Sequence, residues 1–153
     1  MKRLIIYGVL IYLVIIAPVK RADVGKLEPV EVVYLSEQDE RVVLNTDTGG
    51  TGHGKNVHEA LEDLKETTAG VVYLDTAEFL LLKENATKYI DDLRDILKKS
   101  VKVCFVEGEI DLKKAAKYLS IHKNLPLLRL WNTEEKLPFL MDEKIIEKSQ
   151  KSS

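Results

Sequence analysis

The chain has 153 residues, a length that suits one domain. Its hydrophobic fraction of 45% and charged fraction of 31% exclude an intrinsically disordered protein. The chain has 23 lysines and arginines and 25 acidic residues, but four of the bases, Lys2, Arg3, Lys20 and Arg21, flank one apolar segment. The remainder carries 19 bases against 25 acids, a net charge of −6. This acidic body excludes a typical nucleic-acid-binding protein and predicts repulsion from anionic membranes.

The uncharged segment behind Lys2 and Arg3 starts at Leu4 and ends at Val19. A basic start before an apolar run is typical of a signal peptide or a signal anchor. The nearest small-residue cleavage pattern begins at Ala17, but it contains a proline and two bases follow it, which favours an uncleaved anchor. A helix of residues 4–19 would be about 24 Å long, slightly short of a ~30 Å bilayer core. The flanking bases can snorkel to the interface and make up the difference. We predict that residues 1–22 attach the chain to a membrane, with the body outside the cytoplasm.

The body begins with a linker, and two β-branched runs follow it at residues 30–35 and 41–46. The polar residues between these runs predict a β-hairpin. Asn56 is expected to cap a helix, with Glu59 three residues later as in a capping box. Further strands are predicted at residues 71–74, 78–82 and 101–106. Further helices are predicted at residues 87–98 and after Asp111, which is expected to cap the second of these two helices.

This alternation predicts an α+β or α/β fold, with a mixed β-sheet and about three helices, preceded by one N-terminal transmembrane or signal segment. Residues 23–140 are expected to form a single domain. Residues 141–153 are expected to be a frayed polar tail.

The glycine-rich stretch Gly49-Gly50-Thr51-Gly52-His53-Gly54-Lys55-Asn56 has two interpretations. Gly49, Gly54 and Lys55 match a G-x-x-x-x-G-K-[ST] phosphate loop, and Asp75 ends a strand like the acid that supports Mg²⁺ in such proteins. Asn56 stands where that loop needs a hydroxyl group. The favoured interpretation is a turn in which glycines allow positive φ before a helix. A degenerate phosphate loop of Gly49, Gly54, Lys55 and Asp75 is the alternative.

The sequence predicts neither a metal site nor a catalytic set. Part of the same stretch nearly fits an EF-hand calcium loop, but the closing glutamate is missing; the matching residues are Asn45, Asp47, Gly49, Gly50 and Asn56. The histidines, His53, His58 and His122, are expected at the surface. The single cysteine, Cys104, excludes an intramolecular disulfide and reads as a buried core residue. No cofactor is expected.

A pattern of small and apolar residues continues from the glycine stretch into the following helix. Tyr73 and Leu74 then stand at a turn, and residues 79–84 form a strand closed by Glu84. This pattern resembles the N-terminal domain of the Ger(x)C family, the lipoprotein subunit of spore germinant receptors. The positions that match its G-x-G stretch and its T-x-x-E-A-l-x-x-L helix are Gly52, Gly54, Glu59, Ala60, Leu61 and Leu64. The chain differs from that family in lacking a lipobox cysteine, in having Asp75-Thr76 in place of Gly-His, and in ending after one domain.

The resemblance implies an extracytoplasmic, membrane-associated, non-enzymatic domain with a link to sporulation or spore germination. The apolar segment would then replace the lipid as the tether. We therefore expect an interaction domain at the cell membrane, with its body on the extracytoplasmic side or between spore membranes. The expected partners are membrane or envelope proteins, and no nucleic acid. The alternative is a degenerate P-loop-like nucleotide-binding protein.

Overall fold

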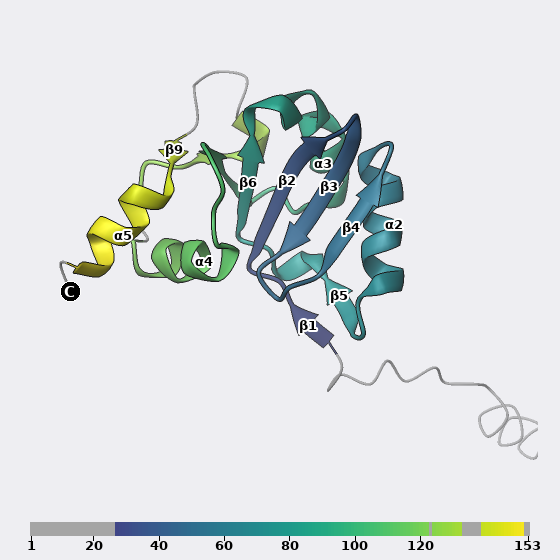
Figure 1. The fold of residues 1–153 in the computed structure, drawn as a ribbon, viewed down its shortest axis with the longest axis horizontal. Coiled ribbons are helices and arrows are strands. Elements are labelled where there is room, and N and C mark those ends of the chain that lie inside the picture. The colour runs from purple at the N-terminus through teal and green to yellow at the C-terminus, as the bar shows by residue number, and fades with distance from the viewer. Residues whose placement is uncertain (1–26, 123, 133–138, 152–153) are drawn as a thin grey trace, which may run out of the picture.

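The computed structural model describes residues 27–122, 124–132 and 139–151 (Figure 1). A mixed sheet of seven strands lies at the centre of this part, in the order β4-β3-β2-β6-β7-β8, with β9 also paired to β7. Its strands are β2 (Val32–Gln38), β3 (Arg41–Thr46), β4 (Thr51–Gly54), β6 (Phe79–Lys83), β7 (Lys102–Val106), β8 (Leu128–Arg129) and β9 (Phe139–Met141). β2, β6, β7 and β9 run parallel, whereas β3, β4 and β8 pair antiparallel with their neighbours.

The predicted hairpin is confirmed as β2 and β3. Its turn is shorter than the polar stretch suggested, because β2 continues to Gln38, which pairs with Arg41. Only Asp39 and Glu40 remain in the turn, with φ values of 50° and 61°. Two consecutive residues with positive φ are typical of the type I′ turn, whose twist matches that of paired strands.

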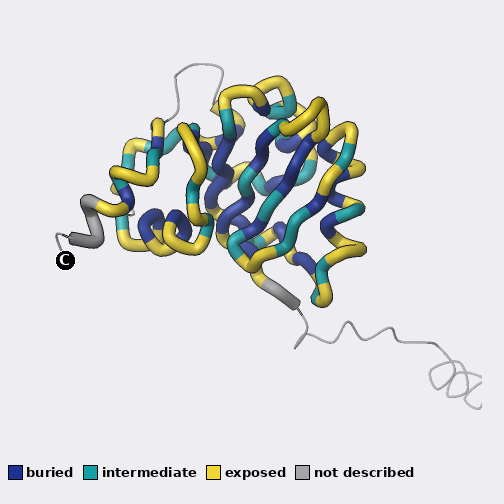
Figure 2. The backbone as a smooth tube through the Cα atoms, viewed as in Figure 1, coloured by how far each residue is buried: buried dark blue, intermediate teal, exposed yellow. Residues whose placement is uncertain are grey.

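Helices cover both faces of the sheet. α2 (Val57–Thr67) and α3 (Ile90–Ile96) pack on one face, and α4 (Leu112–Ile121) and α5 (Glu143–Lys151) pack on the other. Alternate strand residues supply the two cores, so that Val33 faces α2 and α3 while Val32 faces α4 and α5. Figure 2 shows the resulting buried strands between more exposed helices. Short 3₁₀ turns join several elements: η2 (Leu74–Thr76), η3 (Glu84–Tyr89) and η4 (Leu130–Asn132).

The fold is therefore α+β with a mixed sheet, as expected, but the described residues contain four α-helices instead of three. The frayed polar tail expected at residues 141–153 is wrong over its described part. Met141 ends a strand, and α5 follows with Ile146 only 1% exposed. The helix was not predicted from the sequence because few of its residues are apolar. Its burial depends instead on contacts with α4 and the sheet.

A separate two-stranded sheet lies at one end of the body. β1 (Leu27–Pro29) pairs in parallel with β5 (Val71–Tyr73), although more than 40 residues separate them along the chain. Figure 1 shows this pair below the lower ends of β2 and β6. The predicted anchor at residues 4–19 lies outside the described residues. Within the described part of the chain, no helix is both long and apolar enough to cross a membrane.

Candidate functional site

The glycine-rich stretch forms a strand and its preceding turn. Gly49 lies in the β3–β4 turn with φ +98°, and Gly52 and Gly54 belong to the edge strand β4. A Cβ atom at Gly52 would overlap the backbone of Ala60, and one at Gly54 would lie 2.6 Å from the Glu59 Cβ. Positive φ therefore explains Gly49, as expected, whereas close approach of helix α2 explains Gly52 and Gly54.

The outer edge of β4 is occupied by side chains of α2. The His53 N–H donates to the Asp63 carboxylate at 2.7 Å, and the Thr67 hydroxyl donates to the Thr51 carbonyl oxygen at 3.0 Å. These bonds satisfy outward-pointing backbone groups that an added strand would need. The edge of β4 is thus protected against pairing with another chain.

The start of α2 is not arranged as a phosphate site. The predicted capping box is confirmed: the Glu59 N–H donates to Asn56 Oδ1 at 2.8 Å, and the Lys55 N–H donates to Glu59 Oε2 at 2.9 Å. The Glu59 carboxylate therefore lies where a phosphate would bind, and its charge would repel an anion. Lys55 itself is exposed.

Asp75 is not brought into the same sheet as the glycine stretch. It lies in η2, directly after β5, which pairs with β1 instead of with the central sheet. β3, the strand before the glycines, runs antiparallel to its neighbours. Phosphate loops instead join a strand to a helix within a parallel sheet. The arrangement of Gly49, Gly54, Lys55 and Asp75 thus gives no support to nucleotide binding.

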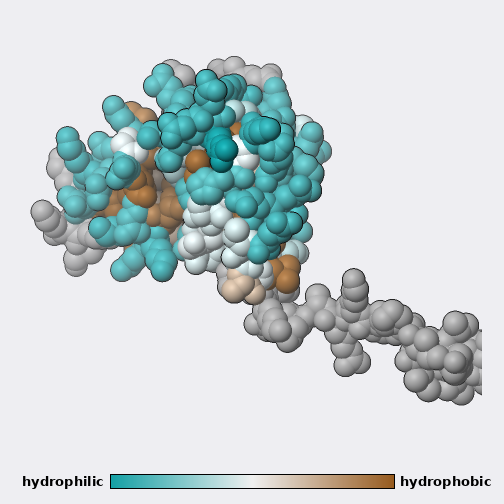
Figure 3. All heavy atoms as spheres, turned by 45° about the vertical axis from the view of Figure 1, so that its right-hand side comes forward, coloured by the Kyte–Doolittle hydropathy of each residue, from teal (hydrophilic) through white to brown (hydrophobic). Residues whose placement is uncertain are grey.

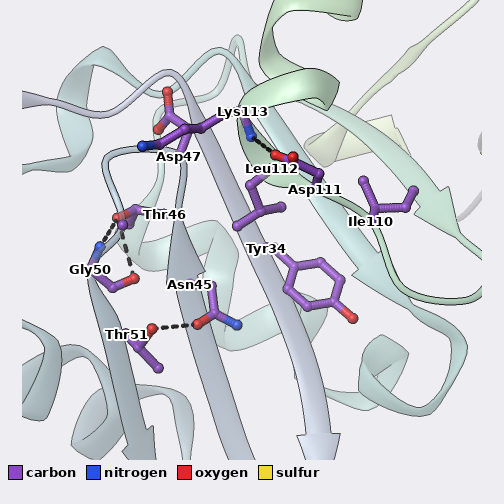
Figure 4. Close-up of a pocket in the computed structure, with 11 residues that line it drawn as sticks. Tyr34, Asn45, Thr46, Asp47, Gly50, Thr51, Ile110, Asp111, Leu112 and Lys113 are labelled. Atoms are coloured by element: carbon purple, nitrogen blue, oxygen red, sulfur yellow. Dashed lines mark hydrogen bonds between the residues drawn. The ribbon is translucent and has the colours of Figure 1, made fainter. Parts of the chain in front are cut away.

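An open groove lies on the opposite face of the sheet, between β2–β4 and the start of α4 (Figure 4). Its volume is about 350 Å³. Tyr34, Asn45 and Thr51 form one row of its floor, because the strand register places each beside the next. The β3–β4 turn forms one wall, and Ile110 and Leu112 form the other. The groove exists because the core on this side includes side chains from β2, β6 and β7 but none from the described residues of β3 or β4.

Most polar groups around the groove are already hydrogen-bonded within the chain. Asp47 accepts from the N–H groups of Glu31 and Val32 at 3.2 and 3.3 Å, which fixes the start of β2. Asp111 accepts from the N–H groups of Lys113 and Lys114 and so caps α4 as predicted. Both carboxylates thus hold backbone segments in place at the rim of the groove.

Two polar groups in the groove form no hydrogen bond to the described residues. The Asn45 carboxamide accepts a 2.7 Å bond from the Thr51 hydroxyl at Oδ1, but its Nδ2 has no such partner. The Tyr34 hydroxyl likewise has none, and its ring lies near Leu112 (Figure 4). The groove thus offers an amide donor and a phenol beside apolar side chains. Sequence reasoning missed it because the strand register, which is not visible in the sequence, assembles the row.

The remaining candidate residues are placed apart or buried. Asn45, Asp47 and Asn56, which nearly fit a calcium loop, each accept a hydrogen bond from another residue of the chain. His53 and His58 are exposed, whereas His122 is partly buried and stacks on Tyr118 at a 4.3 Å centroid distance. Among the residues that the structure describes, no three His, Cys, Asp or Glu side chains could together hold a metal ion.

Cys104 is a core residue, as predicted. It is 0% exposed, and its Sγ lies 3.1 Å from the Phe139 carbonyl oxygen across the β7–β9 pair. Burial raises the pKa of its thiol to about 12, because the thiolate would lose its solvation. The thiol is therefore protonated and unreactive at neutral pH.

A comparison of the chain with known protein families, with curated proteins and with solved structures finds no significant match.

Proposed function

We propose that this protein is a membrane-anchored, non-enzymatic interaction domain that uses the groove between α4 and the outer face of β2–β4 to bind a membrane or envelope protein. Its body would lie on the extracytoplasmic side of the cell membrane, or between spore membranes. The observation that carries the proposal is the groove itself, whose Asn45 Nδ2 and Tyr34 hydroxyl remain free of bonds to the described residues.

The groove suits an extended segment of polypeptide. An unpaired side-chain amide can donate to a backbone carbonyl, and the apolar wall of Ile110 and Leu112 can receive a side chain. The groove is open to solvent instead of enclosed. A contact with another protein requires such an open surface, whereas a site for a small substrate is usually a closed pocket. The edge of β4 is closed by α2, so the groove is a better candidate than strand addition there.

Photocrosslinking tests this function. A photoreactive amino acid at Thr51, in the groove, should crosslink a second membrane or envelope protein in intact cells. The same photoreactive amino acid in place of Glu66, which is exposed on α2, should give no such crosslink. The variant Asn45→Arg should abolish the crosslink, because it fills the groove and removes the amide. Recovery of the chain alone in several mild detergents, with no crosslink from Thr51, would contradict the proposal.

The link to sporulation or spore germination rests on the Ger(x)C resemblance, which covers about residues 30–118. Expression confined to sporulating cells would support it. Equal expression in vegetative cells, with no sporulation or germinant-receptor genes nearby, would argue for a general envelope role instead.

A further inference from the structure

Two apolar side chains are exposed together on strand β5. Val71 is 53% exposed and Tyr73 is 41% exposed, whereas Val72 between them is 8% exposed and belongs to the core. Since side chains alternate along a strand, Val71 and Tyr73 point to the same side. Single exposed apolar residues are ordinary on a protein surface, but a pair on one face of a strand indicates a contact surface.

The pair lies in an uncharged stretch of the chain. Residues 67–74 contain no charged side chain, in a chain of which 31% is charged. They adjoin the start of β4, because the Thr67 hydroxyl donates to the Thr51 carbonyl oxygen at 3.0 Å. Pale and brown spheres gather at the lower end of the body in Figure 3, the end at which Figure 1 shows β1 and β5. Residues 67–74 are therefore an uncharged stretch in an acidic body, with Glu28 of β1 and the exposed Asp75 at its borders.

The chain enters the body at this same end. β1 starts at Leu27, and only residues 20–26 separate it from the apolar segment that ends at Val19. Seven residues reach at most about 25 Å when fully extended. A bilayer that holds residues 4–19 would therefore lie close to β1 and its partner β5. The far end of β2, at Gln38, lies a further seven-residue strand away, about 23 Å.

From this placement we infer that the β1–β5 end of the body rests on the lipid headgroups of the membrane that holds its own N-terminal segment, with Val71 and Tyr73 in the interfacial layer. The inference rests on the proposed anchorage. Two side chains bind a membrane weakly by themselves, but a short tether makes the contact intramolecular and raises its effective concentration. Tyrosine is suited to this layer because its ring is apolar and its hydroxyl is polar.

Site-specific labelling of the full chain in phosphatidylcholine vesicles tests the inference. Val71→Cys and Tyr73→Cys each place an environment-sensitive fluorophore at the inferred contact, and Gln38→Cys places one at the far end of β2. Ile121→Cys, at a residue 65% exposed on α4, controls for labelling at an apolar surface position elsewhere. The native Cys104 is 0% exposed and should not take the label, which a mock-labelled parent chain checks.

Quenching by headgroup-nitroxide lipids is expected to be several-fold stronger at positions 71 and 73 than at 38 and 121. A separate label at Thr48→Cys should be quenched less in the double variant Val71→Asp, Tyr73→Asp than in the chain with Val71 and Tyr73 intact. The double variant should keep its fold, since both side chains are exposed. If the chain floats with the vesicles but all positions are quenched equally, the inference is wrong and the anchorage stands. If the chain fails to float with the vesicles, the proposed anchorage is wrong, and the inference falls with it.

Discussion

Gly52 lies directly against the backbone of Ala60, so that any side chain at position 52 would overlap the Ala60 carbonyl oxygen. The contact joins the edge strand β4 to helix α2, and Leu64 closes it on the next turn, 2.7 Å from where a Cβ would stand. The glycines that resembled a phosphate loop are thus explained in part by helix–strand packing.

Gly52→Ala should lower the free energy of unfolding by at least about 2 kcal/mol, because the backbone of α2 cannot yield to the added methyl group. Urea unfolding followed by circular dichroism measures the loss. Gly49→Ala is the matched control, since nothing lies within 4 Å of its Cβ position and only its φ of +98° is strained. That control should cost about 1 kcal/mol. Equal losses in both variants would contradict the packing explanation.

The Asn85 side chain extends the central sheet beyond the end of β6. Its Nδ2 donates to the Glu37 carbonyl oxygen at 2.7 Å, and its Oδ1 accepts from the Glu37 N–H at 3.3 Å. Asn85→Ala should lower the free energy of unfolding by about 1 kcal/mol, because both peptide groups lose their protein partner. Asn124→Ala, at an exposed amide without a hydrogen bond to the described residues, should be neutral. Thermal unfolding of the two variants side by side tests this difference.

Burial of Ile146 ties α5 to the body. Ile146 is 1% exposed and packs in the same core as Met141 and Leu119. Ile146→Ala should lower the free energy of unfolding by about 2–4 kcal/mol, because it removes buried methyl groups and leaves a cavity. Ile121→Ala, at a residue 65% exposed on α4, should change it by less than about 0.5 kcal/mol. If neither variant changed the free energy of unfolding beyond experimental error, the C-terminus would be a frayed tail, as its composition suggested.

The Cys104 thiol makes stability depend on alkaline pH. An unfolded cysteine ionises above its ordinary pKa of 9.0, whereas burial holds the folded thiol neutral up to about 12. The unfolded state therefore binds fewer protons than the folded state between these values, so the free energy of unfolding should fall as pH rises from 9 to 12. Cys104→Ala should lose this component of the pH dependence. Native-state reaction with a thiol reagent at pH 8, at the rate seen in urea, would show that the thiol is not buried.

Local features of the fold were readable from the sequence. The capping box of Asn56 and Glu59 and the cap at Asp111 were predicted because each rests on hydrogen bonds between residues within one helical turn. The β2–β3 hairpin and the burial of Cys104 were predicted because runs of β-branched residues mark strands. The acidic body and the uncharged N-terminal segment are properties of composition alone.

Other features were decided only by the tertiary structure. The groove needs the register that places Tyr34, Asn45 and Thr51 side by side, and register depends on pairing between strands. β9 and α5 are fixed by contacts with β7 and α4, because their own residues are too few or too polar to signal burial. The closeness of β1 to β5 likewise joins segments far apart in the chain. The sequence therefore determined the elements whose hydrogen bonds are local, while long-range packing decided which surfaces those elements leave open.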